Sequence, residues 1–496
     1  MYKRKLFFIL LIGGWCLFIL NPVNAQIENW PQFRGVNCSG VAAEGQDPPI
    51  NFGPDKNILW KTSLPKGYSS PCIWADCIFI TGIEEAGKLL KLFCINRKDG
   101  TIRWEESIAV KEFERIHAVG NAATATPSTD GERIYFYFGS YGLICYDFKG
   151  EQQWKMSMPI PQSRHEMGTS PIVTGDLVIL NCFGDYSDPR LLAINKYDGS
   201  IVWKHSLPKI KNRDSYSTPV IYKDEVIIYA SDYVSGYDKK TGDSKWRFAI
   251  DVADAVCTPV LGKNILYTVS YSAMGNPNMR AQFPDFMEFA AQYDGNGDLL
   301  LDKNEVKDFQ FLLYPEMPEI PGYNVPIMYV MGWWDKNKDT YIDSTEWKNM
   351  SDKWEARYNR QGLKAIKLGG EGDIGLNDFI WGHTEDVPYI SSPLIFNDFI
   401  FMIKNGGIIS CFQAESGNLL YRDKLGASGM YFSSLIGANG RIYAASLNGI
   451  ITVFEAGSKL NIIAQNNLND KIIATPAVVD DKLYIRTAGS LYAFGE

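Results

Sequence analysis

The stretch of sequence that decides the fold is ATPSTDGERIYFYFGSYGLICYDFKGEQQW, residues 125–154. It opens with a Thr-Pro step, continues through two short runs of β-branched and aromatic residues, and closes with a glycine four residues before a tryptophan. Short runs of this composition between turn residues are typical of antiparallel strands. Four such strands make one propeller blade, so the stretch predicts a blade.

The same unit returns along the chain about eight times, at a spacing of about 40–45 residues that is typical of repeat architectures. The openings are Ser70-Pro71, Thr126-Pro127, Ser170-Pro171, Thr218-Pro219, Thr258-Pro259, Ser392-Pro393, Ser434-Leu435 and Thr475-Pro476. The closings are Gly100/Trp104, Gly150/Trp154, Gly199/Trp203 and Gly242/Trp246, with a weaker Gly417/Tyr421. We expect the glycine to supply the positive φ of an outer turn and the tryptophan to pack between adjacent blades.

The last unit, residues 473–494, ends without an outer strand and without a tryptophan. Residues 57–61, which include Trp60, have the sequence of that missing strand. Joining the two ends closes the ring and removes exposed sheet edges. We therefore predict an all-β, eight-bladed β-propeller that is closed by an N-terminal strand.

One interval is longer than the others. Pro259 and Pro393 are separated by about three times the usual spacing, so roughly ninety residues are inserted into the repeat pattern. We expect the fifth blade to be split around a small α-helical insertion. The predicted domains are a signal peptide at 1–25, propeller segments at 26–271 and 363–496, and the insertion at 272–362.

Two stretches of the insertion resemble the calcium-binding loop of EF-hands. The ligands expected in the first are Asp294, Asn296, Asp298, Leu300 through its carbonyl, Asp302 and Glu305. Those expected in the second are Asp335, Asn337, Asp339, Tyr341 through its carbonyl, Asp343 and Glu346. This spacing suits a hard cation that takes six to eight oxygen ligands, with the last glutamate giving both its oxygens. Apolar residues at helical spacing flank both loops, so we expect two hands that pair face to face.

The sixth loop position departs from the EF-hand pattern, because Leu299 and Thr340 stand where glycine is usual. A left-handed conformation costs a residue with a side chain about 1–2 kcal/mol. We expect calcium in at least one loop, and in the second if only one binds, because threonine is smaller and more polar than leucine. The alternative is a degenerate pair of hands that serves as a helical spacer.

The N-terminus has the order of a secretory signal peptide: basic residues at 3–5, an apolar run at 6–20 and a small-residue end at 23–25. Cleavage after Ala25 would leave a periplasmic or secreted protein. The alternative is a membrane anchor, but this run is shorter than the about 20 residues that span a bilayer. No other stretch is long enough, so no transmembrane segment is expected in the mature chain.

The composition argues against several functions. The formal net charge is −8 at pH 7, whereas nucleic-acid binding by counterion release requires clustered basic residues. Most cysteines lie in strand-like apolar runs, where they are expected to be small buried residues. The chain has no C-x-x-C-H haem motif, and its four histidines do not suggest a histidine-rich metal site.

The tryptophan closings, the opening stretch Asn29-Trp-Pro-Gln-Phe-Arg-Gly35 and residues 125–139 resemble the pyrroloquinoline-quinone (PQQ)-type propeller repeat family. The resemblance covers most of the mature chain and is nearest to exported bacterial members, some of which carry EF-hand insertions. It implies one of two functions. Quinoprotein dehydrogenases of this family hold PQQ in the central funnel with calcium, a catalytic aspartate and often two adjacent cysteines. Another branch includes the propeller of the outer-membrane barrel-assembly machinery, a binding scaffold without cofactor.

This chain has no adjacent cysteines, and none of its acidic residues can be matched to the catalytic aspartate. We therefore expect an exported binding or scaffold protein with a calcium-binding insertion and no assigned catalytic residue. Its partner on the propeller face would be a protein or a carbohydrate. The alternative is a quinone- and calcium-dependent dehydrogenase of small alcohols or sugars.

Polar residues precede several inner strands, at the place where propeller loops line the funnel mouth. Residues 163–168 include His165 and Glu166, His117 stands before the second unit, and Asp214 and Tyr216 stand before the fourth. These side chains could bind a small ligand or peptide, or polarise a substrate. The other interpretation is hydrogen bonding between adjacent loops.

Overall fold

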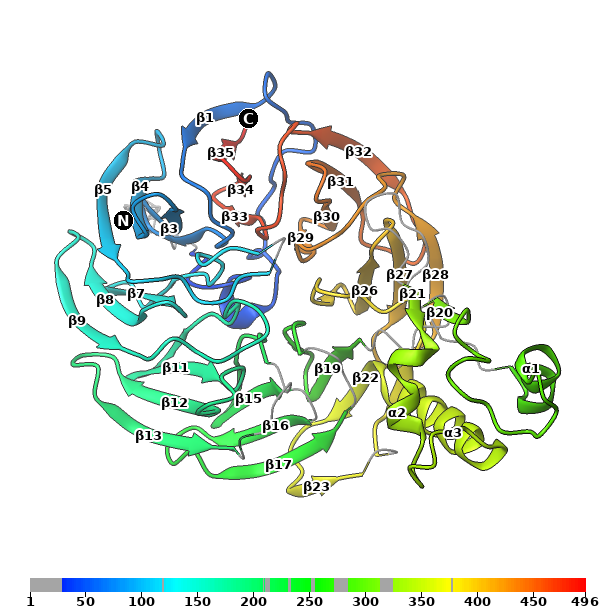
Figure 1. The fold of residues 1–496 in the computed structure, drawn as a ribbon. Coiled ribbons are helices and arrows are strands. Elements are labelled where there is room, and N and C mark those ends of the chain that lie inside the picture. Colours follow the sequence, from blue (N-terminus) through cyan, green and yellow to red (C-terminus); the bar gives the residue numbers. More distant parts are fainter. Residues whose placement is uncertain are drawn as a thin grey trace, which may run out of the picture.

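The computed structural model describes residues 29–496, apart from 118–119, 208, 210–214, 231–232, 251–254, 272–283, 313–323 and 376–377. The predicted signal peptide, residues 1–25, lies outside the described residues. Eight sheets form a ring around a central axis, seen end-on in Figure 1. The prediction of an eight-bladed, all-β propeller is therefore confirmed. No helix in the described part of the chain is long and apolar enough to cross a bilayer.

The four main strands of each blade pair antiparallel. Blade 1 contains β2 (Cys72–Trp74), β3 (Cys77–Glu84), β4 (Leu89–Asn96) and β5 (Ile102–Ala109). Blade 2 contains β6 (Ser128–Thr129), β7 (Arg133–Phe138), β8 (Gly142–Asp147) and β9 (Gln152–Ser157). Blade 3 contains β10 (Ile172–Thr174), β11 (Leu177–Cys182), β12 (Arg190–Asn195) and β13 (Ile201–Ser206). Blade 4 contains β14 (Val220–Tyr222), β15 (Glu225–Ala230), β16 (Tyr233–Asp238) and β17 (Ser244–Ala249).

The second half of the ring repeats this plan. Blade 5 contains β18 (Val260–Leu261), β19 (Ile265–Ser270), β22 (Gly362–Lys367) and β24 (Trp381–His383). Blade 6 contains β25 (Leu394–Phe396), β26 (Phe399–Lys404), β27 (Ile408–Gln413) and β28 (Leu419–Lys424). Blade 7 contains β29 (Ile436–Ala438), β30 (Arg441–Ala445), β31 (Ile450–Glu455) and β32 (Ile462–Asn467). Blade 8 contains β33 (Ala477–Val479), β34 (Lys482–Arg486), β35 (Ser490–Phe494) and β1 (Ile58–Ser63).

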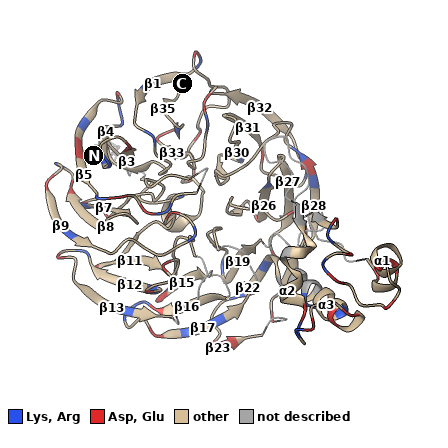
Figure 2. Cartoon of the chain, in the orientation of Figure 1, with Lys and Arg blue, Asp and Glu red and all other residues tan. Residues whose placement is uncertain are grey.

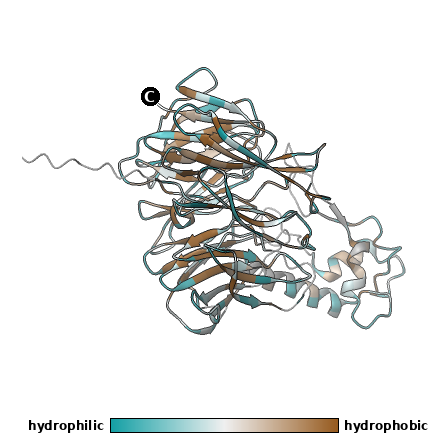
Figure 3. Ribbon diagram, turned by 90° about the vertical axis from the view of Figure 1, so that its left-hand side faces the viewer, coloured by the Kyte–Doolittle hydropathy of each residue, from teal (hydrophilic) through white to brown (hydrophobic). Residues whose placement is uncertain are grey.

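The middle strands of each blade are the most buried, because both of their faces pack against neighbouring blades. Strand β7 is buried from its second residue on, whereas the outer strand β9 alternates between buried and exposed residues. Figure 3 shows the hydrophobic strands inside the blades, and Figure 2 shows charged residues on several outer strands. All eight cysteines of the described chain are buried free thiols.

The α-helices of the described chain lie between β19 and β22, outside the ring (Figures 1 and 3). The elements of this insertion are α1 (Phe286–Tyr293), β20 (Gln310–Leu312), β21 (Asn324–Pro326), the 3-10 helix η2 (Ile327–Tyr329), α2 (Met331–Trp334) and α3 (Ser344–Arg360). Both longer helices begin at an aspartate: Asp285 accepts from Met287 N at 2.8 Å, and Asp343 accepts from Glu346 N at 2.8 Å. Such caps satisfy backbone donors that have no partner within the helix.

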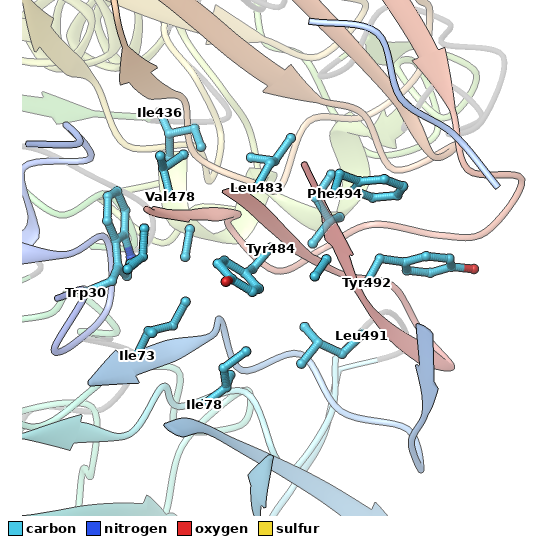
Figure 4. Close-up of a cluster of buried hydrophobic side chains, with 14 of the residues drawn as sticks. Trp30, Ile73, Ile78, Ile436, Val478, Leu483, Tyr484, Leu491, Tyr492 and Phe494 are labelled. Carbon is cyan, nitrogen blue, oxygen red and sulfur yellow. The ribbon is translucent and has the colours of Figure 1, made fainter. Parts of the chain in front are cut away.

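The N-terminal strand closes the ring as predicted. β1 pairs with β35 in antiparallel register from Ile58↔Phe494 to Ser63↔Ser490. Figure 4 shows the apolar cluster that joins blade 8 to its neighbours and to Trp30 of the N-terminal segment. The closure therefore buries apolar side chains as well as pairing the last sheet edge.

The eight Ser/Thr residues that open the repeats form a closed hydrogen-bonded ring. The backbone N–H of each donates to the hydroxyl of the corresponding residue in the next blade, at 2.9–3.3 Å. Thr475 donates to Ser70 and so completes the circle. Ser434 takes part although Leu435 replaces the proline. All eight repeats therefore share the hydroxyl but not the proline. The hydroxyl is needed because it satisfies a buried backbone donor in the adjacent blade.

The glycine and tryptophan of the repeat contact each other across blades. The closing glycines have φ values of +75°, +89°, +75°, +77° and +74° at Gly100, Gly150, Gly199, Gly242 and Gly417. Each lies against the outer-strand tryptophan of the preceding blade, in order Trp60, Trp104, Trp154, Trp203 and Trp381. The indole N–H of each tryptophan donates to a carbonyl of the same turn region, at 2.9–3.1 Å. Each of these tryptophans therefore packs between two blades against a glycine of the next blade, where a larger residue would collide with the ring. We call this contact the glycine seat.

Trp246 is the exception, because the next blade is the one that is split. The segment between β22 and β24 contains β23 (Gly372–Ile374), which pairs in parallel with β17 as a fifth strand of blade 4. Trp246 donates instead to Glu225 Oε2 of its own blade at 2.8 Å. The tryptophan is still almost fully buried.

The segment before β1 crosses one end of the central channel. It pairs with blade 1 through Trp30 and Ile73 and with blade 7 through Val41 and Gly437. The 3-10 helix η1 (Val36–Cys38) lies against β14 of blade 4. Arg34 is fully buried there and donates to Pro393 O at 2.7 Å. Burial lowers the pKa of this guanidinium to about 10.

Candidate functional site

A cavity of about 190 Å³ occupies the centre of the ring. All eight hydroxyl residues of the hydrogen-bonded ring line it, together with loops from several blades. Its aromatic lining residues are Phe33, Tyr68, Tyr216, Tyr389 and Phe432. Its strongly polar lining residues are His117, His165 and Glu166. We call this cavity the funnel pocket.

The polar residues that the sequence indicated at the funnel mouth do come together. The rings of His117 and His165 are 4.8 Å apart and perpendicular, and the rings of His165 and Tyr216 are 6.1 Å apart. Glu166 Oε2 accepts from the backbone N–H of His117 at 2.9 Å. Asp214 lies outside the described residues. Contacts between loops and a shared pocket thus coexist, so the two interpretations of these residues are compatible.

Glu166 is held close to the backbone of the neighbouring loop. A Cβ at Gly120 would collide with the Glu166 carboxylate, so only glycine leaves room for it. The carboxylate therefore stays at the pocket, where it is partly exposed.

A second carboxyl group, Glu114, lies behind this site and was not indicated by the sequence. Its Oε2 accepts from Met167 N at 3.0 Å, and its own N–H donates to Ser140 Oγ at 2.9 Å. The first bond ties the loop after β5 to the segment that carries His165 and Glu166, and the second ties it to the turn between β7 and β8. A lone glutamate in a loop has no distinguishing spacing, so only tertiary contacts reveal its position.

Burial raises the pKa of Glu114 from 4.5 to about 8, and the charge of Glu166 adds to this effect. The folded protein therefore keeps this proton at pH values where the unfolded chain has released it. The free energy of unfolding should fall as pH rises from about 5 to 8, by about 3 kcal/mol for this group. Urea denaturation of Glu114→Gln over this pH range should lack that fall.

The matched control for this prediction is Glu112→Gln, an exposed glutamate in the same loop. It should keep the pH dependence of the original protein. An unchanged slope in Glu114→Gln would show that Glu114 is not protonated in the folded state.

In the first predicted calcium loop, the carboxylates at the first and twelfth positions accept hydrogen bonds from backbone N–H groups of the same loop. Asp294 accepts from Gly297 N and Leu299 N at 2.7 and 2.8 Å. Glu305 accepts from Gly295 N at 3.1 Å and Asp302 N at 3.0 Å. Every oxygen of these two carboxylates therefore already has a backbone donor.

In the second loop, the backbone donors of the described chain reach only one oxygen of each of the corresponding carboxylates. Asp335 Oδ2 accepts from Thr340 N at 2.9 Å, and Glu346 Oε1 accepts from Lys336 N at 2.6 Å. Among the described residues, no donor reaches the other two oxygens, Asp335 Oδ1 and Glu346 Oε2, although both are buried. A buried acceptor without a donor is costly, and coordination to a cation removes this cost. These are the first and twelfth positions of the predicted loop.

Other predicted ligands lie in the same two loops. Asn296 and Asp298 are hydrogen-bonded to each other at 2.9 Å, and Asn337 and Asp339 at 2.7 Å. Asp302 and Asp343 cap the segments that follow each loop, while Leu300 N and Tyr341 N donate to the aspartate two residues earlier. Across the described residues, no three His, Cys, Asp or Glu side chains are gathered closely enough to hold a metal as they stand.

The two loops lie side by side. Leu301 and Ile342 form an antiparallel bridge with hydrogen bonds of 3.1 and 3.0 Å. Beneath the bridge, Phe289 stacks on Trp347 at a centroid distance of 4.5 Å. This apolar core includes residues of α1, α2 and α3, so the hands pack as one unit.

The sixth loop positions adopt the left-handed conformation that an EF-hand turn requires. The φ values are +60° at Leu299 and +77° at Thr340. Both are residues for which this region is unfavourable by about 1–2 kcal/mol. Both positions therefore have a backbone conformation that glycine adopts without this cost.

These observations define an eight-bladed propeller with a central funnel pocket and a helical insertion that carries two paired loops. The profile of the family described as "Outer membrane protein assembly factor BamB" matches residues 91–282. Among curated proteins, none matches the sequence significantly.

Several solved structures share the fold. BamB from Moraxella catarrhalis is 11% identical with a TM-score of 0.51, over 88% of this chain and 99% of that chain. A europium-containing methanol dehydrogenase is 10% identical with a TM-score of 0.56, over 95% and 98%. The quinohemoprotein alcohol dehydrogenase from Comamonas testosteroni is 9% identical with a TM-score of 0.55, over 94% and 81%. At such identities the likeness shows the propeller fold alone.

Proposed function

We propose that this chain is an exported PQQ-like propeller that acts as a binding or scaffold protein, with the funnel pocket as its binding site. The observation that carries this proposal is the lining of the pocket. Loops from different blades bring aromatic, hydroxyl and carboxylate groups to one central cavity. A concave, largely apolar site with a few polar groups is what ligand binding requires. The proposed partner, which binds on the propeller face, is a protein or a carbohydrate.

The alternative function, a quinone-dependent dehydrogenase, requires the pocket to hold PQQ. PQQ is a planar tricarboxylate, and basic side chains are the usual partners of carboxylates in proteins. The described lining residues include no lysine or arginine, while Glu166 presents a negative charge. The lining residues of the funnel pocket therefore do not suit PQQ.

The test is reconstitution of the purified protein with PQQ and calcium. Equilibrium dialysis should recover no bound quinone, and small alcohols or sugars should not reduce an acceptor dye. A known quinoprotein prepared in parallel shows that the conditions support loading. Stoichiometric PQQ binding with dye reduction would overturn the proposal in favour of the dehydrogenase.

We further propose that the second loop of the insertion binds calcium, through the residues predicted between Asp335 and Glu346. The two buried carboxylate oxygens without donors support this assignment, because calcium prefers oxygen ligands and tolerates irregular geometry. The first loop is the weaker candidate, since its terminal carboxylates are already saturated by backbone N–H groups.

Calcium should raise the melting temperature of the protein, and Glu346→Gln should weaken binding at least about tenfold because it removes the charge of the twelfth ligand. Calorimetric titration measures the affinity directly. Glu305→Gln should have a smaller effect, and the double variant should abolish the thermal shift.

Asp352→Asn is the matched control, because this exposed carboxylate lies in α3 outside the predicted loop and pairs with Lys348. It should titrate like the original protein. A titration without calcium heat would refute the proposal, and so would an equal affinity in Glu346→Gln.

A signal peptide at residues 1–25 would carry the chain out of the cytoplasm, to the periplasm or beyond. The description of the matching family, an outer membrane protein assembly factor, agrees with an exported location. N-terminal sequencing of the mature protein tests cleavage after Ala25.

A further inference from the structure

Five aromatic side chains from separate parts of the described chain line the funnel pocket. They are Phe33 of the N-terminal segment, Tyr68 before β2, Tyr216 before β14, Tyr389 before β25 and Phe432 before β29. Tyr216 and Phe432 are 8% and 7% exposed, and the other three are half-buried. These rings therefore have a fixed place in the fold and still border the cavity.

The described lining of the pocket carries one acidic side chain. Glu166 is the one carboxylate among its described lining residues, and a hydrogen bond from His117 N at 2.9 Å holds it there. Glu114 lies behind it and accepts from Met167 N, but burial raises its pKa to about 8, so at neutral pH it adds little negative charge. No lysine or arginine occurs among the described lining residues to neutralise this charge.

Aromatic faces carry partial negative charge and attract cations within about 6 Å, most strongly where water is excluded. A carboxylate beside such faces adds a direct electrostatic attraction. Together these groups suit a ligand that is positively charged and apolar on its surface. Alkylated ammonium groups have this combination, whereas hydrated metal ions and anions do not.

We propose that the funnel pocket binds a small organic cation with a quaternary or alkylated ammonium group. This inference rests on the proposed function, since it names the class of ligand for the same pocket. The aromatic side chains that line the pocket contact the methyl or methylene groups, and Glu166 neutralises the charge. The Ser/Thr ring supplies hydroxyl oxygens for a polar tail.

Calorimetric titration with two probes of the same shape tests the inference. The first is choline, and the second is its uncharged analogue, in which a tert-butyl group replaces the trimethylammonium group. Choline should bind at least about tenfold more tightly, because only the charged probe gains from the rings and the carboxylate.

Glu166→Gln separates charge from shape. Glutamine keeps an oxygen that can accept from His117 N, so the loop contact is preserved while the charge is lost. Choline affinity should fall about tenfold, and affinity for the uncharged analogue should not change. Tyr389→Leu should also weaken choline binding. Glu132→Gln, at an exposed turn in blade 2, is the matched control and should bind choline like the original protein.

The outcomes distinguish the two levels of the proposal. Equal affinity for choline and its analogue would overturn the cation inference but leave a ligand-binding pocket. Failure of both probes to bind would overturn the cation inference, while the proposed function would still be judged by the PQQ experiment. Quinone binding without choline binding would overturn both.

Discussion

Removal of residues 29–64 is expected to prevent the chain from folding into a stable monomer. Blade 8 would lose β1, its outer strand, and β35 would become an exposed sheet edge. The apolar cluster at the closure would lose Trp30, Phe52 and Trp60, all of which are buried. Unpaired edges and exposed apolar surface both promote aggregation. Size-exclusion chromatography should show aggregates instead of a monomer.

A permuted chain provides the control. Gly495 N donates to Asn57 O at 3.0 Å, so the end of β35 lies next to the start of β1. A two-residue Asn-Gly turn can join such antiparallel strands. Residues 65–496 followed by this turn and residues 57–64 should therefore recover a folded monomer. Its melting temperature should remain below that of the original, because the segment that crosses the channel is still absent.

If the truncated chain were monomeric and as stable as the original, closure by β1 would not be a requirement of this fold. If the permuted chain aggregated as readily as the truncated one, the segment that crosses the channel would be the essential element instead.

Gly242→Ala is expected to destabilise the protein by about 2–5 kcal/mol, the sum of a left-handed alanine and an overpacked contact. Gly242 has a φ of +77°, and a Cβ there would lie 2.5 Å from Cε3 of Trp203. The ring cannot withdraw without breaking the bond from its N–H to Lys239 O at 2.9 Å. Urea denaturation followed by tryptophan fluorescence measures the loss.

Gly175→Ala separates the two contributions. Gly175 also has a positive φ, +58°, but a Cβ there would meet no atom within 4 Å. This variant should lose only the conformational contribution, about 1–2 kcal/mol. Equal losses in the two variants would mean that contact with the tryptophan does not explain the repeated glycine.

Much of the fold was predictable because its signals are local. Turn glycines, strand composition and the spacing of tryptophans recur within each repeat, so they indicate the blades without knowledge of contacts. The long interval between Pro259 and Pro393 marked the position at which the structure has its helices. The funnel-mouth residues His117, His165, Glu166 and Tyr216 were also recognisable, because each precedes an inner strand.

Other features could not be predicted from spacing. The Ser/Thr residues were recognised as repeat openings, but their role depends on a hydroxyl from the next blade, such as Ser70 for Thr475. Trp246 matches the repeat, yet its glycine seat is absent because β23 occupies the neighbouring segment. No sequence pattern distinguishes Glu114, because the rise in its pKa arises from burial in the folded protein.

By itself the sequence determined the number of blades, the closure by an N-terminal strand and the candidate ligand set of both loops. These depend on residues that are close together in the chain. The tertiary structure alone decided which oxygens of the second loop are buried without donors and which rings line the funnel pocket. Those properties depend on burial and on contacts between distant segments, because a side chain's solvation and partners are set only when the ring closes.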